Sequence, residues 1–368
     1  MRYLALLLAV STIVSCNHHD KGKSKIADFS VIAYYSGNAT LVDSFPIEKL
    51  THIIYSFCHL KGNRLNVDNA DDTLTIEKLV SLKSRNPGLK ILLSLGGWGG
   101  CRSCSPVFAS DSARKEFASS VKNLSHYFKT DGIDLDWEYP AIEGHPGHPY
   151  LPEDKPNFTA LIKTLRDSLG TELEISFAAG GFVKYLEESI DWKEVMPLVD
   201  KVNIMSYDLV GGYSTVTGHH TPLYSSPFVK ESADRAIRYL DSIAVPKNKL
   251  VIGAAFYART WENVADSNNG LFQPGHFKHS TAYFDLDRLL SRDSGYSYYY
   301  DSAARASYAY HHGKKLFATF DDSLSVALKT KYALDNGLNG IMFWELVLDK
   351  KHDGMVDLID RVVKESKK

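Results

Sequence analysis

Short apolar runs alternate with helical patterns along the chain from residue 29 onwards. Eight of these runs have the length and composition of strands, at residues 29–37, 50–60, 89–98, 132–140, 172–181, 201–209, 250–259 and 337–346. Most of them are continuously apolar, which is typical of parallel strands that helices cover on the outside.

Between the runs, apolar residues three and four positions apart predict amphipathic helices. The clearest patterns lie at residues 113–128, 158–169 and 228–243, and Asp111 or Ser112 is the expected N-cap of the first. Eight strands that alternate with helices in a chain of 368 residues favour an α/β fold, a (β/α)8 TIM barrel. A doubly wound open sheet is the alternative, but no G-x-G-x-x-G motif opens a helix after a strand.

One interval departs from this alternation of strands and helices. Residues 260–336 separate the seventh and eighth runs, far more than a loop between a strand and a helix needs. The stretch is rich in Tyr and contains further strand-like segments, so we expect a small α+β module at residues 261–316, inserted between strands 7 and 8. A helix at 321–336 then precedes the last strand, and the barrel domain as a whole spans 29–368.

The fourth run carries acids within apolar sequence, in the segment DGIDLDWEYP. Asp134, Asp136 and Glu138 alternate with apolar residues, so all three point to one face, with neighbours roughly 6–7 Å apart. In a barrel that face opens on the mouth formed by the strand ends. Closely spaced, buried carboxylates hold at least one proton at neutral pH, which prepares a general acid. Glu138, last on the predicted strand, is the best candidate.

A metal site and a structural ion-pair network are the alternatives to catalysis for the acidic strand. A Mg²⁺ or Ca²⁺ site usually draws carboxylates from several strands, because one face of one strand cannot surround an ion. An ion-pair network needs basic partners, and this strand has none adjacent to it. Catalysis is therefore the favoured interpretation, with no metal and no cofactor expected.

The histidines and cysteines give little sign of a metal site. His145 and His148 lie three apart, but two prolines and two glycines around them favour a turn-rich surface loop. Cys101 and Cys104 form C-x-x-C in a Gly/Ser-rich loop without a second ligand pair of fitting spacing. We expect a disulfide between two of Cys58, Cys101 and Cys104, with the pairing open.

The N-terminus has the pattern of a secretory signal peptide at residues 1–15, with one positive charge at Arg2 followed by a short apolar run. Residues 13–16 resemble a bacterial lipobox, in which the cysteine, here Cys16, is lipidated and becomes the first mature residue. An ordinary cleaved signal with an incidental cysteine is the alternative. The lipobox predicts an exported bacterial lipoprotein, periplasmic or at the cell surface, with a flexible tether at 16–28.

Composition narrows the classes of partner. Lys and Arg total 42 against 44 Asp and Glu, a net charge of −2, so nothing indicates a nucleic-acid partner or an anionic membrane surface. Lipid contact is expected only through Cys16, and no protein partner is implied. The 21 tyrosines matter because sugar rings stack on exposed aromatic faces.

The acidic motif carries a specific resemblance. D-x-x-D-x-D-x-E, filled by Asp131, Asp134, Asp136 and Glu138, resembles the signature of family 18 glycoside hydrolases, the chitinase family. SLGGW at 94–98, MSYD at 205–208 and GIMFWEL at 340–346 resemble that family's third, sixth and eighth strands, in the right order. The segment FYAR followed by the insertion resembles the subfamily with an α+β module between strands 7 and 8.

The resemblance implies hydrolysis of β-1,4-linked N-acetylglucosamine, in chitin or chitooligosaccharides, by a retaining, substrate-assisted mechanism. Glu138 would protonate the glycosidic oxygen and later activate water. The substrate's own acetamido oxygen would attack the anomeric carbon to give an oxazolinium intermediate. Asp136 would bind the acetamido N–H, and Asp134 would tune the charge of Asp136.

Other roles carried over by the resemblance concern the sugar. Tyr207 would donate its hydroxyl to the acetamido carbonyl, and Asp208 would help to fix the sugar. Trp344 would stack under the ring, and Met205 would wall the acetamido pocket. Further residues at strand ends are candidates for sugar contact, with loop packing as the alternative: Trp98, Tyr139, Tyr213, Trp261 and Arg259.

Two competing functions stay open on the sequence. The first is an endo-β-N-acetylglucosaminidase that cleaves N-glycan cores, which the insertion argues against because a deeper groove suits a linear chain. The second is a non-catalytic sugar-binding protein, against which the retained Glu138, Asp136 and Tyr207 argue.

Overall fold

The computed structural model describes residues 29–368. The predicted signal peptide (1–15), the lipidation site Cys16 and the tether (16–28) lie outside the described residues. Within residues 29–368, no helix is both long and apolar enough to cross a membrane.

Eight parallel strands of the described chain close into a barrel, because β1 pairs with both β2 and β14. The strands are β1 (Ser30–Tyr35), β2 (His52–Lys61), β4 (Lys90–Gly96), β5 (Gly132–Asp136), β6 (Glu174–Gly180), β7 (Lys201–Met205), β8 (Leu250–Ala255) and β14 (Gly340–Trp344). A short strand, β3 (Arg64–Asn66), pairs antiparallel with β2. The predicted (β/α)8 barrel is confirmed.

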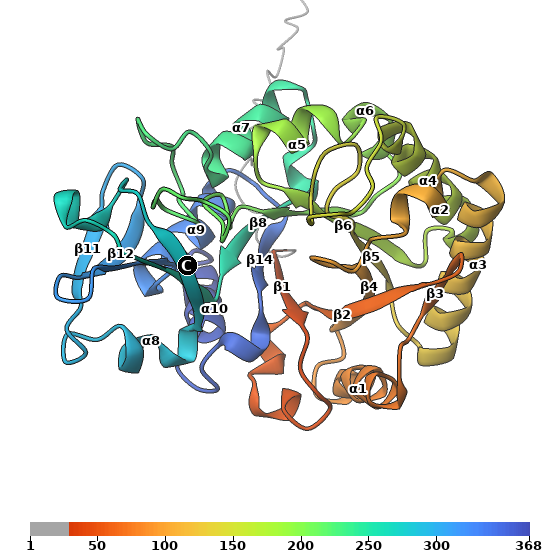
Figure 1. Ribbon diagram of the computed structural model, residues 1–368. Helices are drawn as coiled ribbons and strands as arrows, with labels where there is room; N and C mark the ends of the chain where they lie inside the picture. Colours follow the sequence, from red (N-terminus) through yellow and green to blue (C-terminus); the bar gives the residue numbers. More distant parts are fainter. Residues whose placement is uncertain (1–28) are drawn as a thin grey trace, which may run out of the picture.

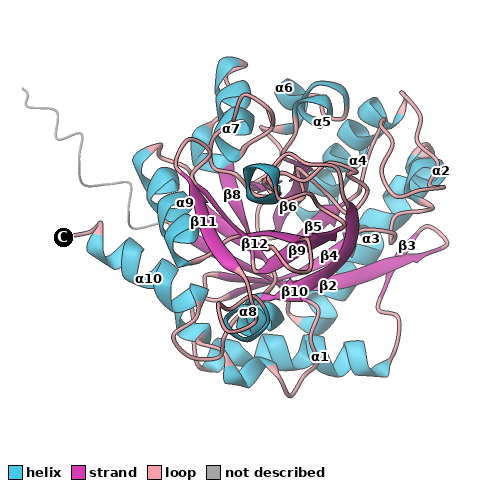
Figure 2. Cartoon of the chain, turned by 60° about the vertical axis from the view of Figure 1, so that its left-hand side comes forward, coloured by secondary structure: helices cyan, strands magenta, loops and turns pink. Residues whose placement is uncertain are grey.

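Helices surround the strands (Figures 1 and 2). They are α1 (Ala70–Ser81), α2 (Cys104–Phe108), α3 (Asp111–Phe128), α4 (Asp154–Leu169), α5 (Val183–Glu188), α6 (Trp192–Val195), α7 (Ala233–Ser242), α9 (Ser323–Asp335) and α10 (Met355–Glu365). Ser110 caps α3 by accepting the amide of Ala113, so the N-cap lies one residue before the predicted position. The third predicted helix begins at Ala233, after its cap Ser232.

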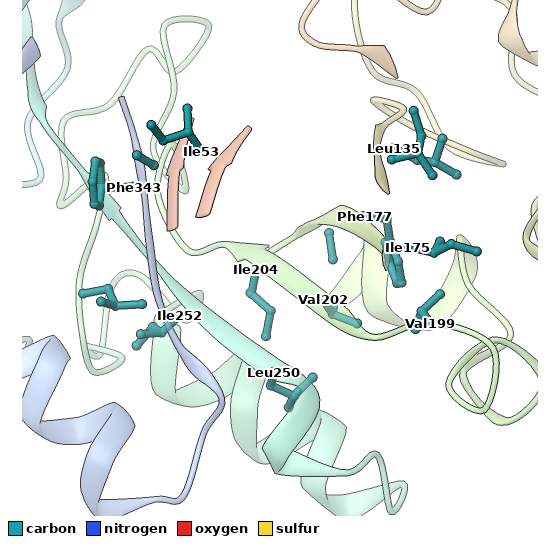
Figure 3. Close-up of a cluster of buried hydrophobic side chains, with 14 of the residues drawn as sticks. Ile53, Leu135, Ile175, Phe177, Val199, Val202, Ile204, Leu250, Ile252 and Phe343 are labelled. Carbon is teal, nitrogen blue, oxygen red and sulfur yellow. The ribbon is translucent and has the colours of Figure 1, made fainter. Parts of the chain in front are cut away.

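The apolar core lies mainly between the strands and this outer layer. Alternate strand residues point outward into it, among them Leu135, Ile204 and Ile252 (Figure 3). A second, smaller cluster fills the barrel interior and includes Tyr34, Leu92 and Met342. Both faces of each strand are therefore buried, which explains why the sequence runs are continuously apolar.

The insertion is a five-stranded antiparallel sheet in the order β10-β9-β13-β12-β11. Its elements are β9 (Tyr257–Glu262), β10 (His276–Ala282), α8 (Tyr283–Leu289), β11 (Ser297–Asp301), β12 (Ala306–His311) and β13 (Leu316–Phe320). The module therefore begins at Tyr257, four residues before the predicted 261, and extends past 316. The predicted seventh run, 250–259, is two strands that only Phe256 separates.

Short 3₁₀ helices complete the chain: η1 (Val42–Ser44), η2 (Ile47–Lys49), η3 (Leu82–Ser84), η4 (Lys247–Lys249), η5 (Ser267–Gly270) and η6 (Leu346–Leu348). The loop after β7, residues 206–232, lies against one face of the module sheet, where Val210 joins Trp261 and Phe317 in an apolar cluster. Leu286 of α8 packs on the other face of the sheet. The module thus has apolar contacts on both sides.

Candidate active site

A cavity of about 820 Å³ opens at the carboxyl ends of the barrel strands. Its wall combines acids from β5 and the loop after β7 with aromatic residues from several strand ends and from the module. Six of the lining residues define its sides: Trp98, Asp136, Glu138, Asp208, Phe277 and Trp344. The module therefore contributes one wall of the cavity.

Asp134 lies at the base of the site and is fully buried. Its Oδ2 accepts the hydroxyls of Tyr34 (3.1 Å) and Ser94 (2.9 Å). Its Oδ1 accepts Ser176 Oγ (2.6 Å) and Asn203 Nδ2 (3.2 Å). Burial raises the pKa of Asp134, and these four donors oppose that rise. The donors come from four different strands, so the carboxylate is held rigidly.

Asp136 is two residues further along the same face and is only 4 % exposed. Its Oδ1 has no hydrogen-bond partner within the described chain, although Asp136 lines the cavity. Burial, together with the charges of Glu138 and Asp134, raises the pKa of Asp136 well above its usual range. Asp136 therefore takes up a proton more readily than a free carboxyl group does, and it presents an unpaired oxygen to whatever fills the cavity.

Glu138 lies two residues beyond the end of β5, so the strand is shorter than the predicted 132–140. The alternation nevertheless continues, since Trp137 points outward and packs near Phe108 and Phe158. Burial raises the pKa of Glu138 to about 7, with a further rise from the charge of Asp208 and an opposing hydrogen bond from Tyr139. Glu138 is thus able to give and take a proton near neutral pH.

Asp208 and Arg259 form a paired unit in the cavity wall. Arg259 donates Nη2 to Asp208 Oδ2 at 2.5 Å and Nε to Oδ1. Burial works to raise the pKa of Asp208, but Arg259 and His220 outweigh it and hold that pKa well below its usual range. The guanidinium lies 5.4 Å from the ring centroids of both Tyr257 and Phe277. Asp208 is therefore a fixed negative charge, neutralised by its partner.

Tyr207 and Met205 lie two residues apart at the end of β7 and just beyond it, and both line the cavity. The Tyr207 hydroxyl lies 3.8 Å from Met342 Sδ, a weak acceptor. Burial and the charges of Asp136 and Asp208 raise the pKa of Tyr207 well above its usual range. The hydroxyl stays protonated and is free to donate to a stronger acceptor.

Aromatic rings lie at two sides of the acids. Trp344, at the end of β14, stacks on Phe57, with ring centroids 5.6 Å apart and planes within 14°. Trp98, after β4, is 48 % exposed and lies 6.5 Å from Tyr139 and 6.2 Å from the exposed Tyr213. All five rings line the cavity, which gives it stacking surfaces for flat apolar faces.

The prediction that Trp261 contacts sugar is wrong. Trp261 is fully buried, does not line the cavity, and packs against Phe277 and Phe317 inside the module. Its Nε1 donates to the carbonyl of Ser214 at 2.9 Å. The loop after β7 covers this tryptophan, an arrangement that the local sequence does not encode.

The cavity is also lined by residues that the sequence analysis does not name, and those with large or charged side chains include Phe57, Glu143, Tyr257 and Phe277. A signal existed for Tyr257, which lies two residues before Arg259 and so shares its face of β9. Phe57 lies near the end of an apolar run that reads as core throughout. Glu143 and Phe277 reach the cavity through loop and module geometry, for which the sequence has no periodic signal.

Cys101 and Cys104 form a disulfide with Cα atoms 5.1 Å apart, which confirms a disulfide in this loop, and Cys58 is a buried free thiol. Across residues 29–368, no cluster of three or more His, Cys, Asp or Glu side chains is arranged to hold a metal ion. His145 packs on His148 with ring centroids 4.5 Å apart, beside Trp98.

A barrel whose strand ends bring an acid of raised pKa, a second carboxyl with an unpaired buried oxygen and exposed aromatic rings into one cavity has the architecture of a glycoside hydrolase. The sequence comparison agrees: residues 30–349 match the family model for glycosyl hydrolases family 18. The chain belongs to this family.

Among the relatives, Chitinase A1 of Niallia circulans is 30 % identical over 426 aligned residues, which cover 95 % of this chain and 60 % of that protein. The Endochitinase of Manduca sexta is 29 % identical and covers 95 % of this chain and 68 % of that protein. The chain thus spans about 60 % of the length of the first of these relatives.

Two solved structures are also similar. A glycoside hydrolase family 18 N-acetylglucosaminidase from Paenibacillus barengoltzii has a TM-score of 0.83 at 33 % identity, covering 91 % of this chain and 99 % of that chain. The Ostrinia furnacalis Group IV chitinase in complex with allosamidin has a TM-score of 0.84 at 26 % identity, covering 93 % of this chain and all of that one (100 %).

Proposed function

We propose that this protein hydrolyses β-1,4-linked N-acetylglucosamine in chitin or chitooligosaccharides, by a retaining, substrate-assisted mechanism. The observation that carries the proposal is the unpaired Oδ1 of Asp136, buried beside Glu138 and facing the cavity. An N-acetyl group on the sugar supplies both the N–H that this oxygen lacks and the nucleophile that the protein does not provide.

The other carboxylates argue against a protein nucleophile. Asp208 accepts two hydrogen bonds from Arg259, and Asp134 accepts four hydrogen bonds below the cavity. Glu143 lies in the same loop as the acid, five residues beyond it. A retaining enzyme of the two-carboxylate kind needs a free carboxylate opposite the acid. The two lining carboxyls without an ion pair, Asp136 and Glu143, come from β5 or the loop after it, as Glu138 does, and not from a strand across the cavity.

The proposed reaction proceeds in two steps. Glu138 donates its proton to the glycosidic oxygen, the bond from that oxygen to the anomeric carbon breaks, and the acetamido oxygen attacks the same carbon to form the oxazolinium ion. Asp136 accepts the acetamido N–H and Tyr207 donates to its oxygen. Holding nucleophile and electrophile in one molecule gives a high effective concentration.

In the second step the Glu138 carboxylate takes a proton from water. The water oxygen attacks the anomeric carbon, the oxazolinium ring opens, and the product keeps its configuration while Glu138 is again protonated. Trp344 stacks under the reacting sugar and Met205 borders the acetamido group. Asp134 and Asp136 together hold negative charge beside the cation as it develops, which stabilises it.

A second candidate is the release of single N-acetylglucosamine units from a chain end. The similarity to the N-acetylglucosaminidase structure favours this candidate, because that chain is 33 % identical in sequence to this one and is matched over 99 % of its length. The same residues would perform the chemistry, and only the length of the released product would differ.

One experiment tests both candidates. Chitohexaose is incubated with the protein and the products are followed over time, with an N-glycan glycopeptide in parallel. Short oligomers with the glycopeptide intact establish a chitinase, and a single sugar as the first product establishes the second candidate. Release of the glycan with chitohexaose intact moves the protein to the glycan-core enzymes. Binding without any cleavage supports the sugar-binding alternative.

We also propose that the protein acts as an exported lipoprotein anchored through Cys16. The support is the sequence of residues 1–16 alone, a signal-like segment that ends in a lipobox-like motif. A lipid anchor would display the barrel close to a membrane surface on a tether of residues 16–28.

A further inference from the structure

Glu143 is an acidic residue on the cavity wall for which the proposed chemistry has no role. It lies in the loop after β5, five residues beyond Glu138, and its side chain is exposed to the cavity. No hydrogen bond or ion pair within residues 29–368 involves its carboxylate, whereas other exposed acids such as Asp43 and Asp111 form ion pairs. Glu143 is therefore available to a ligand.

The loop holds Glu143 close to the acid. A Cβ added at Gly144 would lie 2.1 Å from the backbone oxygen of Glu138, so only glycine permits this approach. The neighbouring Ile142 is buried in the main core and anchors the same turn. The residues on both sides of Glu143 are thus held in place, one against the backbone of Glu138 and one in the core, so Glu143 does not lie on a loosely attached loop.

The barrel places Glu143 on the leaving-group side. In the closed strand order, β5 is the fourth strand from β14 in either direction, so the two lie opposite one another. Trp344 ends β14 and receives the sugar before the cleaved bond, whereas Glu138 and Glu143 follow β5. Trp98, after the neighbouring β4, provides an exposed ring on the same side as Glu143.

The charges of the cavity leave Glu143 uncompensated. Arg259 is the one lysine or arginine among the described lining residues, and it is bound to Asp208. Neither Asp136 nor Glu138 offers a positive charge that could compensate Glu143, because both are carboxyl groups. Arg102, His145 and His148 lie on the adjoining surface but do not line the cavity.

We propose that Glu143 selects a cationic sugar, a glucosamine unit with a free ammonium group, immediately after the cleaved bond. The inference rests on the proposed function. The sugar before the bond needs its acetyl group, because that group is the nucleophile, whereas the sugar after the bond does not. The preferred substrates are then partially deacetylated chitin chains, cleaved between an acetylated and a deacetylated unit.

The test uses partially N-acetylated chitosan at slightly acidic pH and low salt. Each cleavage creates a new non-reducing end that came from the leaving-group side, and mass spectrometry reads whether it is glucosamine or N-acetylglucosamine. We expect Glu143→Gln to lower the ratio of glucosamine to N-acetylglucosamine ends by about two- to five-fold, since exposed charge pairs are weak. Glu143→Lys lowers it further, and high salt removes the difference between wild type and Glu143→Gln.

Glu153→Gln is the matched control. Glu153 is exposed in the same connection but does not line the cavity, so its substitution leaves the ratio unchanged. An equal ratio in wild type and Glu143→Gln, with chitohexaose still cleaved, overturns the role of Glu143 alone. Failure of the wild type to cleave either chitohexaose or chitosan overturns the proposed function itself.

Discussion

Asp134 and Asp136 lie two residues apart on the inward face of β5, yet Asp134 accepts four hydrogen bonds while Asp136 leaves Oδ1 without a partner. An unsatisfied buried oxygen is unfavourable, by about 1–3 kcal/mol. The unpaired oxygen of Asp136 lies on the cavity wall, where the proposed mechanism expects a substrate N–H. The arrangement thus preorganises a site that only the substrate completes.

Asp136→Asn should lower kcat on chitohexaose by about 10²-fold, because the amide cannot supply negative charge to the developing cation. Steady-state kinetics measure the effect. Asp131→Asn is the control: Asp131 lies at the other end of β5 and accepts the amide of Ile91, so its substitution affects stability and not kcat. Equal loss of kcat in both variants would contradict the assigned role.

Glu138→Gln should keep sugar binding and lower kcat by about 10²–10⁴-fold, because a neutral amide cannot donate a proton to the leaving oxygen. Binding is measured by calorimetry with chitohexaose, and turnover by product formation. Activity within about tenfold of the wild type would remove Glu138 from the role of general acid.

The pH dependence follows from the same residue. The free enzyme needs Glu138 protonated, and its pKa is raised to about 7, so kcat/KM should fall as the pH rises through about 7. The charge of Asp208 contributes to that rise, so Asp208→Asn should lower the pKa of Glu138 and move the alkaline limb to lower pH. If the alkaline limb of the profile stays at the same pH or moves to higher pH in Asp208→Asn, the charge of Asp208 does not raise the pKa of Glu138.

The barrel could be predicted because strands that are buried on both faces appear in the sequence as continuous apolar runs. The inward face of β5 could be predicted because its acids alternate with apolar residues that point outward. The same alternation correctly placed Trp137 outside and Glu138 inside, although the strand ends at Asp136. The burial of Trp261 could not be predicted, because it depends on the loop after β7 folding over the module. The position of Glu143 could not be predicted either, since it depends on the close contact between Gly144 and Glu138.

Cys16→Ser tests the N-terminal prediction, which rests on sequence alone. If Cys16 is lipidated, the wild type partitions into the detergent phase after export and the variant into the aqueous phase, because the lipid chains are the expected membrane contact. The partition is measured with the full chain expressed in a bacterium with a lipoprotein pathway. Equal partition of the two proteins would contradict lipidation at this residue.

The junction of the barrel and the module contains a buried ion pair. Lys329 of α9 and Asp321, just after β13, are both fully buried, and Nζ lies 2.6 Å from Oδ2. The same oxygen accepts the amide of Ala255 at 3.0 Å, and Oδ1 accepts Ser325 Oγ at 2.7 Å. One carboxylate therefore ties the end of β8 to α9.

Lys329→Met should reduce the free energy of unfolding by about 3–5 kcal/mol, because it leaves the Asp321 carboxylate buried without its cation. Urea unfolding measures the change. Lys331→Met is the matched control on the same helix, since Lys331 is 63 % exposed and pairs with Asp335. That variant should lose no more than about 0.5 kcal/mol. Similar losses of unfolding free energy in the two variants would show that burial of the ion pair does not determine its contribution to stability.

The double variant Asp321→Leu with Lys329→Met separates charge from hydrogen bonding. Removing both charges ends the desolvation penalty, so the double variant should be more stable than Lys329→Met alone. The recovery of stability should remain incomplete, because the buried amide of Ala255 then loses its acceptor. Leaving such a donor unsatisfied costs about 1–3 kcal/mol. Full recovery to wild-type stability would mean that Asp321 contributes nothing to the junction beyond compensating Lys329.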